Sequence, residues 1–593
     1  MVNDIKKELL RFFCRPEVII ILIATVLRII LANMAGIWFP SSAGEDDRLL
    51  VEYAILPGHF GAPNIMSLVK TMSFPLFLDF VHLTGMTYST VITIFWIVAA
   101  VLAVYCFRQI NSNRWFLLFT YLFILFTPAA FDVMTGTRLY RNAIIVPFVF
   151  ICFLLMLIIL FKTIQNKNLT AKDILCPSIF LGFFFLFTYY IKEDGIWLLP
   201  CLCLAIFVVI LISVIRFAKK QKGSRRTNSF VRLTATFLVP LIIFSAGTEL
   251  YKAINLRYFG VAEINTRTEG ELGKFVSNVY KIESEKRTTQ IWAPYDAIQK
   301  AFDASPTLQE YPDLEDQIMH TPWFSNDIVQ DPIPGDFLTW VLRTALKDTG
   351  IWQSEKQMND LFAKVNTELA AAFENGELQK DNSFQISASG GGRTFDEILQ
   401  LKTPIKREYE SAVFLNAYEP GGKAESDYTD PASCEYATLL THTNLLWLND
   451  TTIKVAETET ANRVISLIFK IYSVLNPLLL VLAAIGFVTA IIRLIRRKKN
   501  KMKKTDCNLL LGSVLTMFVL FGIGFMYAFS IAWFSEFVWL RAGMDDWILK
   551  FYSIGLVPLL SLFYLFGLSL FTKNLAQVIT TRRSKKNALA KPS

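Results

Sequence analysis

Charged residues that could do chemistry gather in four short segments, each of which lies between two long apolar runs. These segments are 38–73, 132–142, 191–195 and 535–550, and each contains both carboxylates and cations. The first segment carries three adjacent acids soon after an apolar run ends. The candidate site residues are Glu45, Asp46, Asp47, Arg138, Arg141, Lys192, Glu193, Asp194 and Arg541.

Carboxylates placed beside cations suit the transfer of a group from a phosphate to a hydroxyl. A carboxylate can accept the proton of the attacking hydroxyl, and cations or a metal can stabilise the phosphate as it leaves. The acids at 45–47 are therefore candidates for the base, and the sequence does not choose between Asp46 and Asp47. The candidate phosphate partners are Arg138, Arg141, Lys192 and Arg541.

The elements that must position these residues are membrane-spanning helices. Of 593 residues, 53% are hydrophobic and only 18% are charged, which exceeds what a soluble domain of this size can bury. About 20 apolar residues cross a hydrocarbon core of roughly 30 Å. Ten stretches qualify: 17–38, 88–107, 115–131, 143–161, 174–190, 196–215, 233–250, 472–492, 508–533 and 551–571. The sequence thus predicts a mostly α-helical, polytopic plasma-membrane protein of about ten transmembrane helices.

The distribution of Lys and Arg predicts the orientation, because basic residues near span ends stay on the cytoplasmic side. Alternate segments that include both termini carry 30 such residues, whereas the four segments that hold the candidate site carry 7. We therefore expect both termini in the cytoplasm and the candidate site on the outer face. A lipid-anchored donor would present its phosphate at this level of the membrane.

Residues 251–462 form a large polar insert that divides the chain into an N-terminal transmembrane module (1–250) and a C-terminal one (463–593). The insert has 33 Asp and Glu against 19 Lys and Arg, although the whole chain is +9. The overall basicity is therefore a topology signal, and it gives no reason to expect nucleic acid as a partner. Helical periodicity over 337–352 and 355–378 predicts a helix-rich domain. Its position between the seventh and eighth spans predicts that it is extracytoplasmic. Its single cysteine, Cys434, excludes an internal disulfide.

The first segment resembles the first outward loop of membrane glycosyltransferases of the C-fold class (GT-C). That loop opens with an acidic motif after the first span, and here Glu45-Asp46-Asp47 fits ExD while Asp46-Asp47-Arg48 fits DDx. The resemblance implies a GT-C-like core, a polyprenyl-phosphate sugar donor and a cell-surface glycan acceptor. It also implies that Asp46 or Asp47 is the base, and that Glu193-Asp194 completes the site or binds a divalent metal such as Mg²⁺ or Mn²⁺. The stretches 49–56 and 74–84 look like the juxtamembrane helices of that class.

Two other functions are compatible with the same residues. A transporter or flippase of a lipid-linked saccharide would also use ten spans and outward arginines, but its charges are expected near the bilayer midplane. A non-catalytic scaffold that displays an acidic outer domain would not need charged loops across the mouth of the bundle. The acids at 45–47 and the cations opposite them could also be solvated residues or ion pairs of little energetic value.

Overall fold

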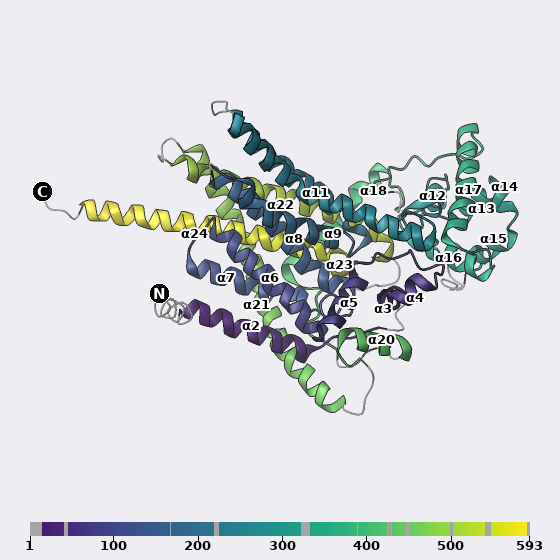
Figure 1. The fold of residues 1–593 in the computed structure, drawn as a ribbon, viewed down its shortest axis with the longest axis horizontal. Helices are drawn as coiled ribbons and strands as arrows, with labels where there is room; N and C mark the ends of the chain where they lie inside the picture. Colours follow the sequence, from purple (N-terminus) through teal and green to yellow (C-terminus); the bar gives the residue numbers. More distant parts are fainter. Residues whose placement is uncertain are drawn as a thin grey trace.

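The computed structural model describes most of the chain, and the fold is mostly α-helical (Figure 1). The described residues are 15–40, 45–166, 168–218, 224–321, 333–387, 390–423, 426, 430–445, 451–497, 502–539 and 547–589. Within them, helices are connected by turns and loops, and strand pairing is limited to isolated bridges. This confirms the predicted helical class.

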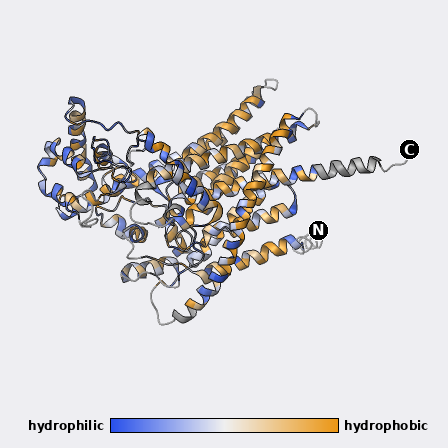
Figure 2. Cartoon of the chain, turned by 180° about the vertical axis from the view of Figure 1, so that it is seen from behind, coloured by the Kyte–Doolittle hydropathy of each residue, from blue (hydrophilic) through white to orange (hydrophobic). Residues whose placement is uncertain are grey.

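Nine helices of the described residues are long and apolar enough to cross a membrane, which indicates a membrane protein. They are α2 (Pro16–Ala35), α6 (Tyr88–Arg108), α8 (Arg141–Gln165), α9 (Ala171–Tyr189), α10 (Leu198–Ala218), α11 (Ser224–Phe259), α21 (Thr451–Ile495), α22 (Lys504–Trp539) and α24 (Leu556–Leu589). Hydrophobic residues dominate these helices, whereas hydrophilic residues are concentrated around α12–α17 at the other end of the molecule (Figure 2).

The predicted span 115–131 differs from the other nine because it is not one long helix. It forms α7 (Arg114–Leu125) and a 3₁₀ turn, η1 (Pro128–Ala130). Helix α7 ends inside the bundle, where its last carbonyls need partners. Arg28 Nε donates to the Leu125 carbonyl at 3.0 Å, and Tyr472 Oη donates to the Phe123 carbonyl at 2.7 Å. The sequence showed the apolar length of this stretch but not the early helix end.

Although α7 is shorter than a full span, the chain still passes from one end of the helical bundle to the other between α6 and α8. At one end of the bundle, Gln165 Nε2 donates to the Gln109 carbonyl at 2.6 Å, which joins the ends of α8 and α6. At the opposite end, Trp38 pairs with Arg138 in a parallel bridge, which joins the loop after α2 to the loop before α8. We call this second end the site end, because the candidate residues lie there.

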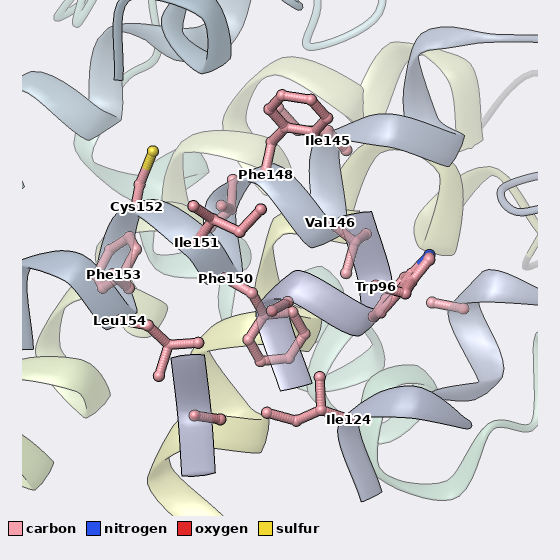
Figure 3. Packing of buried hydrophobic residues seen from close by; sticks show 14 of the residues in the cluster. Trp96, Ile124, Ile145, Val146, Phe148, Phe150, Ile151, Cys152, Phe153 and Leu154 are labelled. Atoms are coloured by element: carbon pink, nitrogen blue, oxygen red, sulfur yellow. The ribbon is translucent and has the colours of Figure 1, made fainter. Parts of the chain in front are cut away.

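Helix α8 forms the centre of the bundle, and almost all of its side chains are buried. Its apolar residues contact neighbours on every side, as expected for a helix that is hydrophobic all round. Figure 3 shows Val146, Phe150 and Phe153 of α8 among residues such as Trp96 of α6 and Ile124 of α7. The first residue of this helix, Arg141, is therefore anchored by the most buried of the nine candidate spans among the described residues.

Short helices cover the site end. The first loop forms α3 (Glu45–Ala54), α4 (Leu56–Gly61) and α5 (Ser73–Thr84), close to the predicted stretches 49–56 and 74–84. Before α10 lies η2 (Glu193–Trp197), and before α24 lie α23 (Trp547–Tyr552) and η5 (Ser553–Gly555).

The insert has two parts in the structure. Its first part packs around a core of its own and contains α12 (Gly270–Val279), α13 (Tyr295–Asp303), α14 (Pro306–Gln309), α15 (Pro312–Met319), η4 (Gly335–Phe337), α16 (Leu338–Asp348) and α17 (Glu355–Asn375). Its second part contains α18 (Phe395–Gln400), α19 (Lys402–Phe414) and α20 (Pro431–Thr441). Helix α19 packs on α21 and α22, and α20 packs on α3 and α5. The helices predicted over 337–352 and 355–378 correspond to α16 and α17.

Candidate functional site

Asp46 and Asp47 lie in the first turn of α3, where backbone N–H groups and the helix dipole favour negative charge. Their environments differ sharply. Asp47 is fully buried and accepts two hydrogen bonds from Arg138, from Nε at 2.9 Å and from Nη2 at 2.5 Å. The Asp46 side chain is 41% exposed. Asp47 is thus sequestered, whereas Asp46 is open to a small molecule.

The position of Arg138 follows from the pairing of two loops. Trp38 N–H donates to the Thr137 carbonyl at 3.0 Å, and Leu139 N–H donates to the Trp38 carbonyl at 2.9 Å. The guanidinium also lies over the rings of Trp38 and Tyr140. Burial lowers the pKa of Arg138, but the charge and hydrogen bonds of Asp47 outweigh this and raise it. The bidentate pair therefore holds α3 against the 131–140 loop.

Asp46 has two polar partners of its own. Lys70 Nζ lies 2.7 Å from Asp46 Oδ1, and Tyr140 Oη donates to Oδ2 at 3.2 Å. Burial favours the neutral acid, but Lys70 and Arg141 outweigh it and hold the pKa of Asp46 below its usual range. The carboxylate is therefore ionised at neutral pH and can accept a proton or a hydrogen bond.

The contact between Asp46 and Tyr140 extends to the third segment through Arg141. Arg141 Nη2 donates to Tyr140 Oη at 2.7 Å, while Nη1 donates to both oxygens of Glu193 at 2.7 and 2.6 Å. Glu193 is the first residue of η2, and this turn packs closely on the end of α9. A Cβ added at Gly195 would lie 2.1 Å from the Tyr189 carbonyl oxygen, so the turn needs a glycine there. These contacts bring the first three predicted segments together.

Lys192 and Asp194 lie beside Glu193 but are only loosely paired. Lys192 Nζ is 3.6 Å from Asp194 Oδ2, and the Asp194 side chain is 36% exposed. Among the described residues, the Lys192 ammonium has no hydrogen-bond partner although it is buried. It is therefore a cation that could bind an anionic ligand without first breaking a strong ion pair.

Sequence reasoning missed the four further residues Lys70, Tyr140, Arg267 and Asp336. Arg267 and Asp336 come from the insert and form an ion pair with each other. Burial alone would lower the pKa of Arg267, but nearby carboxylates, led by Asp336 and Glu193, raise it above its ordinary value. Asp46 also contributes to this shift, so Arg267 belongs to the same electrostatic cluster.

The insert also fixes the position of Lys70. Asn265 Nδ2 donates to the Val69 carbonyl at 3.1 Å, and Thr266 N–H donates to the Leu68 carbonyl at 2.9 Å. Lys70 and Arg267 both lie over the ring of Trp340. A lysine in a segment otherwise poor in cations was a usable sequence signal for Lys70. No signal linked Arg267 to residues more than 200 positions away.

Two predicted site residues cannot be placed in full. Arg541 lies outside the described residues, and so do its neighbours Asp545 and Asp546. Glu45 is the first residue of α3, but its side chain is outside the described part of the structure. Lys550, in the same segment as Arg541, pairs with Asp132 away from Asp46.

Five carboxylates whose side chains the structure describes near the site are each paired with a cation. The pairs are Asp46 with Lys70, Asp47 with Arg138, Glu193 with Arg141, Asp194 with Lys192 and Asp336 with Arg267. Among the described residues, no group of three or more His, Cys, Asp or Glu side chains is arranged to hold a metal ion. Among the described residues, the positive charge beside these carboxylates comes from lysine and arginine side chains.

Comparisons with protein-family models, curated proteins and solved structures find no match to this chain.

Proposed function

We propose that this protein is a membrane glycosyltransferase that moves a sugar from a polyprenyl-phosphate donor to a hydroxyl of a glycan acceptor. The observation that carries the proposal is the half-exposed Asp46 carboxylate, held between Lys70 and Tyr140 at the end of a helical bundle. A lipid donor embedded beside the bundle would present its phosphate at the level of this helix end. The resemblance of Glu45-Asp46-Asp47 to the acidic motif of GT-C enzymes supports the same assignment.

In the proposed reaction, Asp46 is the base. The acceptor hydroxyl oxygen bonds to the anomeric carbon of the donor sugar, and its proton passes to the Asp46 carboxylate. The bond between the anomeric carbon and the phosphate oxygen breaks, and its electron pair leaves with the polyprenyl phosphate. Asp47 does not compete for this role, because both of its oxygens bind Arg138.

The cations of the site would stabilise the departing phosphate. Lys192 is the first candidate, since its ammonium makes no hydrogen bond to the described residues. Arg141 and Arg267 are already held by Glu193 and Asp336, so they are preorganised and lose little freedom on binding an anion.

We also propose an orientation in the membrane, with both termini in the cytoplasm. The excess of Lys and Arg in the segments at the opposite end of the bundle supports a cytoplasmic location for that end and for both termini. The site end and the insert would then face the outside of the plasma membrane.

The test compares two single substitutions in α3 in the organism that carries the gene. In Asp46→Asn we expect loss of a surface glycan modification at normal membrane levels of the protein. Glu52→Gln is the matched control, because Glu52 lies on the same helix and forms an ordinary i,i+4 pair with Arg48. An unchanged surface glycan in Asp46→Asn would exclude Asp46 as the base.

A second measurement separates an enzyme from a flippase. Membranes that contain the protein are given a radiolabelled polyprenyl-phosphate sugar, and the label is followed between the lipid and the glycan fraction. An enzyme releases free polyprenyl phosphate, whereas a flippase moves the intact lipid without cleaving it. Transport of uncleaved donor by the unmodified protein would overturn the proposal.

A further inference from the structure

An apolar patch projects from the second part of the insert beside α22. It is formed by residues 384–387 and 390–400, which we call the hairpin–helix segment and which end with α18. Four of its large apolar side chains are exposed, namely Phe384 (63%), Ile386 (44%), Phe395 (73%) and Leu399 (56%). Phe395 and Leu399 are four residues apart and therefore lie on one face of α18. Exposed clusters of this kind mark interaction surfaces.

The opposite face of the segment is fastened to α22. Ile398 packs with Leu401 against Ala532 and Trp533. The Trp533 indole donates to the Gly391 carbonyl at 3.0 Å, and Arg393 Nη2 donates to the Trp533 carbonyl at 2.6 Å. The patch is therefore held in a fixed position at the site end of α22.

The depth of this position follows from the length of α22. Its charged start at Lys504 and Asp506 marks one membrane boundary, and about 20 residues from Cys507, at 1.5 Å each, reach Met526. Among the side chains of α22 that the structure describes, which end at Phe534, the exposed large apolar ones do not extend beyond Met526: Leu511, Leu515, Phe518, Phe521, Phe525 and Met526. Ala532 lies about 9 Å further along the axis. The patch thus continues the apolar face of α22 at the level of the lipid headgroups.

Basic residues follow the patch in the sequence. Lys402, Lys406 and Arg407, at the start of α19, are exposed. They outnumber the exposed Asp396 of α18 and Glu410, which pairs with Lys406. Apolar side chains next to lysines are typical of elements that lie in the membrane interface, where the apolar groups enter the acyl boundary and the lysines meet lipid phosphates. Continuity with α22 and the flanking charge therefore favour lipid over a second protein as the occupant of this surface.

We propose that the hairpin–helix segment binds the bilayer interface directly and so seats the insert on the membrane. This contact lies more than 100 residues along the chain from Arg267, and it is independent of the reaction assigned to Asp46. The insert would then be held by lipid as well as by its contacts with α21 and α22.

The test measures membrane depth with a nitroxide carried by a genetically encoded amino acid in protein reconstituted into lipid nanodiscs. The label is placed at Leu399 and, as a second site in the same patch, at Phe384. Met526 serves as the lipid-facing reference and the exposed Glu374 of α17 as the aqueous one. We expect the Leu399 and Phe384 labels to show the high oxygen and low nickel-chelate accessibility of the Met526 label.

Two results would overturn this proposal. Accessibility like that at Glu374 would place the patch in water. Low accessibility to both reagents, with dipolar broadening between labels, would show that a second copy of the chain covers it. The Met526 profile verifies in the same preparations that the bundle is folded and inserted.

Discussion

Two buried lysines at the site end each lie 2.7 Å from a carboxylate, but the two carboxylates differ in their exposure and in their other hydrogen bonds. In the first pair, Lys550 and Asp132 are both completely buried. In the second, Lys70 is completely buried but Asp46 is 41% exposed. The ionic contact is the same length, so the difference lies in what else binds the carboxylate.

Asp132 is saturated with hydrogen bonds. Its Oδ2 accepts from the N–H groups of Met134 and Thr135 and from the Thr135 hydroxyl, and its Oδ1 accepts from Glu419 N–H and Lys550. Asp46, by contrast, has one further described donor, Tyr140. We call Asp132–Lys550 a closed pair, because the hydrogen bonds of its carboxylate join separate segments of the chain. We call Asp46–Lys70 an open pair, because its carboxylate keeps lone pairs that a substrate can use. A lysine–aspartate pair therefore has a structural role at Asp132, whereas at Asp46 it leaves a carboxylate that can react.

The open pair is tested by Asp46→Asn, for which we expect the largest effect. Loss of a positioned base should lower the rate of sugar transfer by about 10²–10⁴-fold. The substitution also takes the carboxylate away from the buried Lys70, but water can reach position 46, so the midpoint of thermal unfolding in detergent should fall less than when Asp132 is changed to Asn. A variant that unfolds as early as Asp132→Asn would show that Asp46 is structural, like Asp132.

The closed pair is tested by Asp132→Asn, which should act on stability instead. Removal of one partner leaves Lys550 buried and uncompensated, at a cost of about 3–5 kcal/mol. We expect a lower unfolding midpoint and less folded protein in the membrane. The double variant Asp132→Asn/Lys550→Met should regain part of the loss, because it removes the unpaired charge; no recovery would show that the turn geometry dominates.

Two arginines of the insert are both paired with acids, but only one of them lies near Asp46. Arg267 pairs with Asp336 and is coupled to Asp46, whereas Arg287 pairs with Asp381 and Glu397 away from the site. We expect Arg267→Gln to raise the KM for the lipid donor about tenfold, since a desolvated charge contact contributes roughly 1.4 kcal/mol or more. Arg287→Gln should leave KM unchanged, and equal effects of the two would remove Arg267 from the site.

The sequence predicted the helical class and nine of the ten spans, and it indicated the loops that carry the candidate site, because apolar length and charge placement are local properties. It could not predict which acid is open. Asp46 and Asp47 are adjacent and chemically identical, and only contacts with distant residues distinguish them. Arg138, which reaches α3 through the pairing of Trp38 with the 131–140 loop, binds Asp47, whereas Asp46 contacts Lys70 and Tyr140. It also could not place Arg267, since contacts between residues distant in the chain leave no periodic pattern. The early end of α7 was hidden for the same reason, because it depends on Arg28 and Tyr472.

Glu408 of α19 differs from Asp46 and Asp132, because its carboxyl has no cation partner among the described residues. It is fully buried, and neither oxygen has a hydrogen-bond partner among the described residues. Burial therefore raises its pKa well above the ordinary value for glutamate. Below the ordinary pKa of glutamate, Glu408 is protonated in both the folded and the unfolded state, so it gives stability no pH dependence there.

As the pH rises above the ordinary pKa of glutamate, the unfolded chain loses the Glu408 proton while the folded protein keeps it. Stability then falls with pH, by at most about 1.4 kcal/mol per pH unit from this group. In Glu408→Gln this dependence disappears, so the variant should unfold later than the unmodified protein at pH 8 and nearly together with it at pH 5. Glu410→Gln, which changes an exposed neighbour paired with Lys406, should shift the midpoint little at either pH. If Glu408→Gln were instead less stable at pH 8, Glu408 would be ionised and held by a cation, and it would belong with Asp132 among the closed pairs.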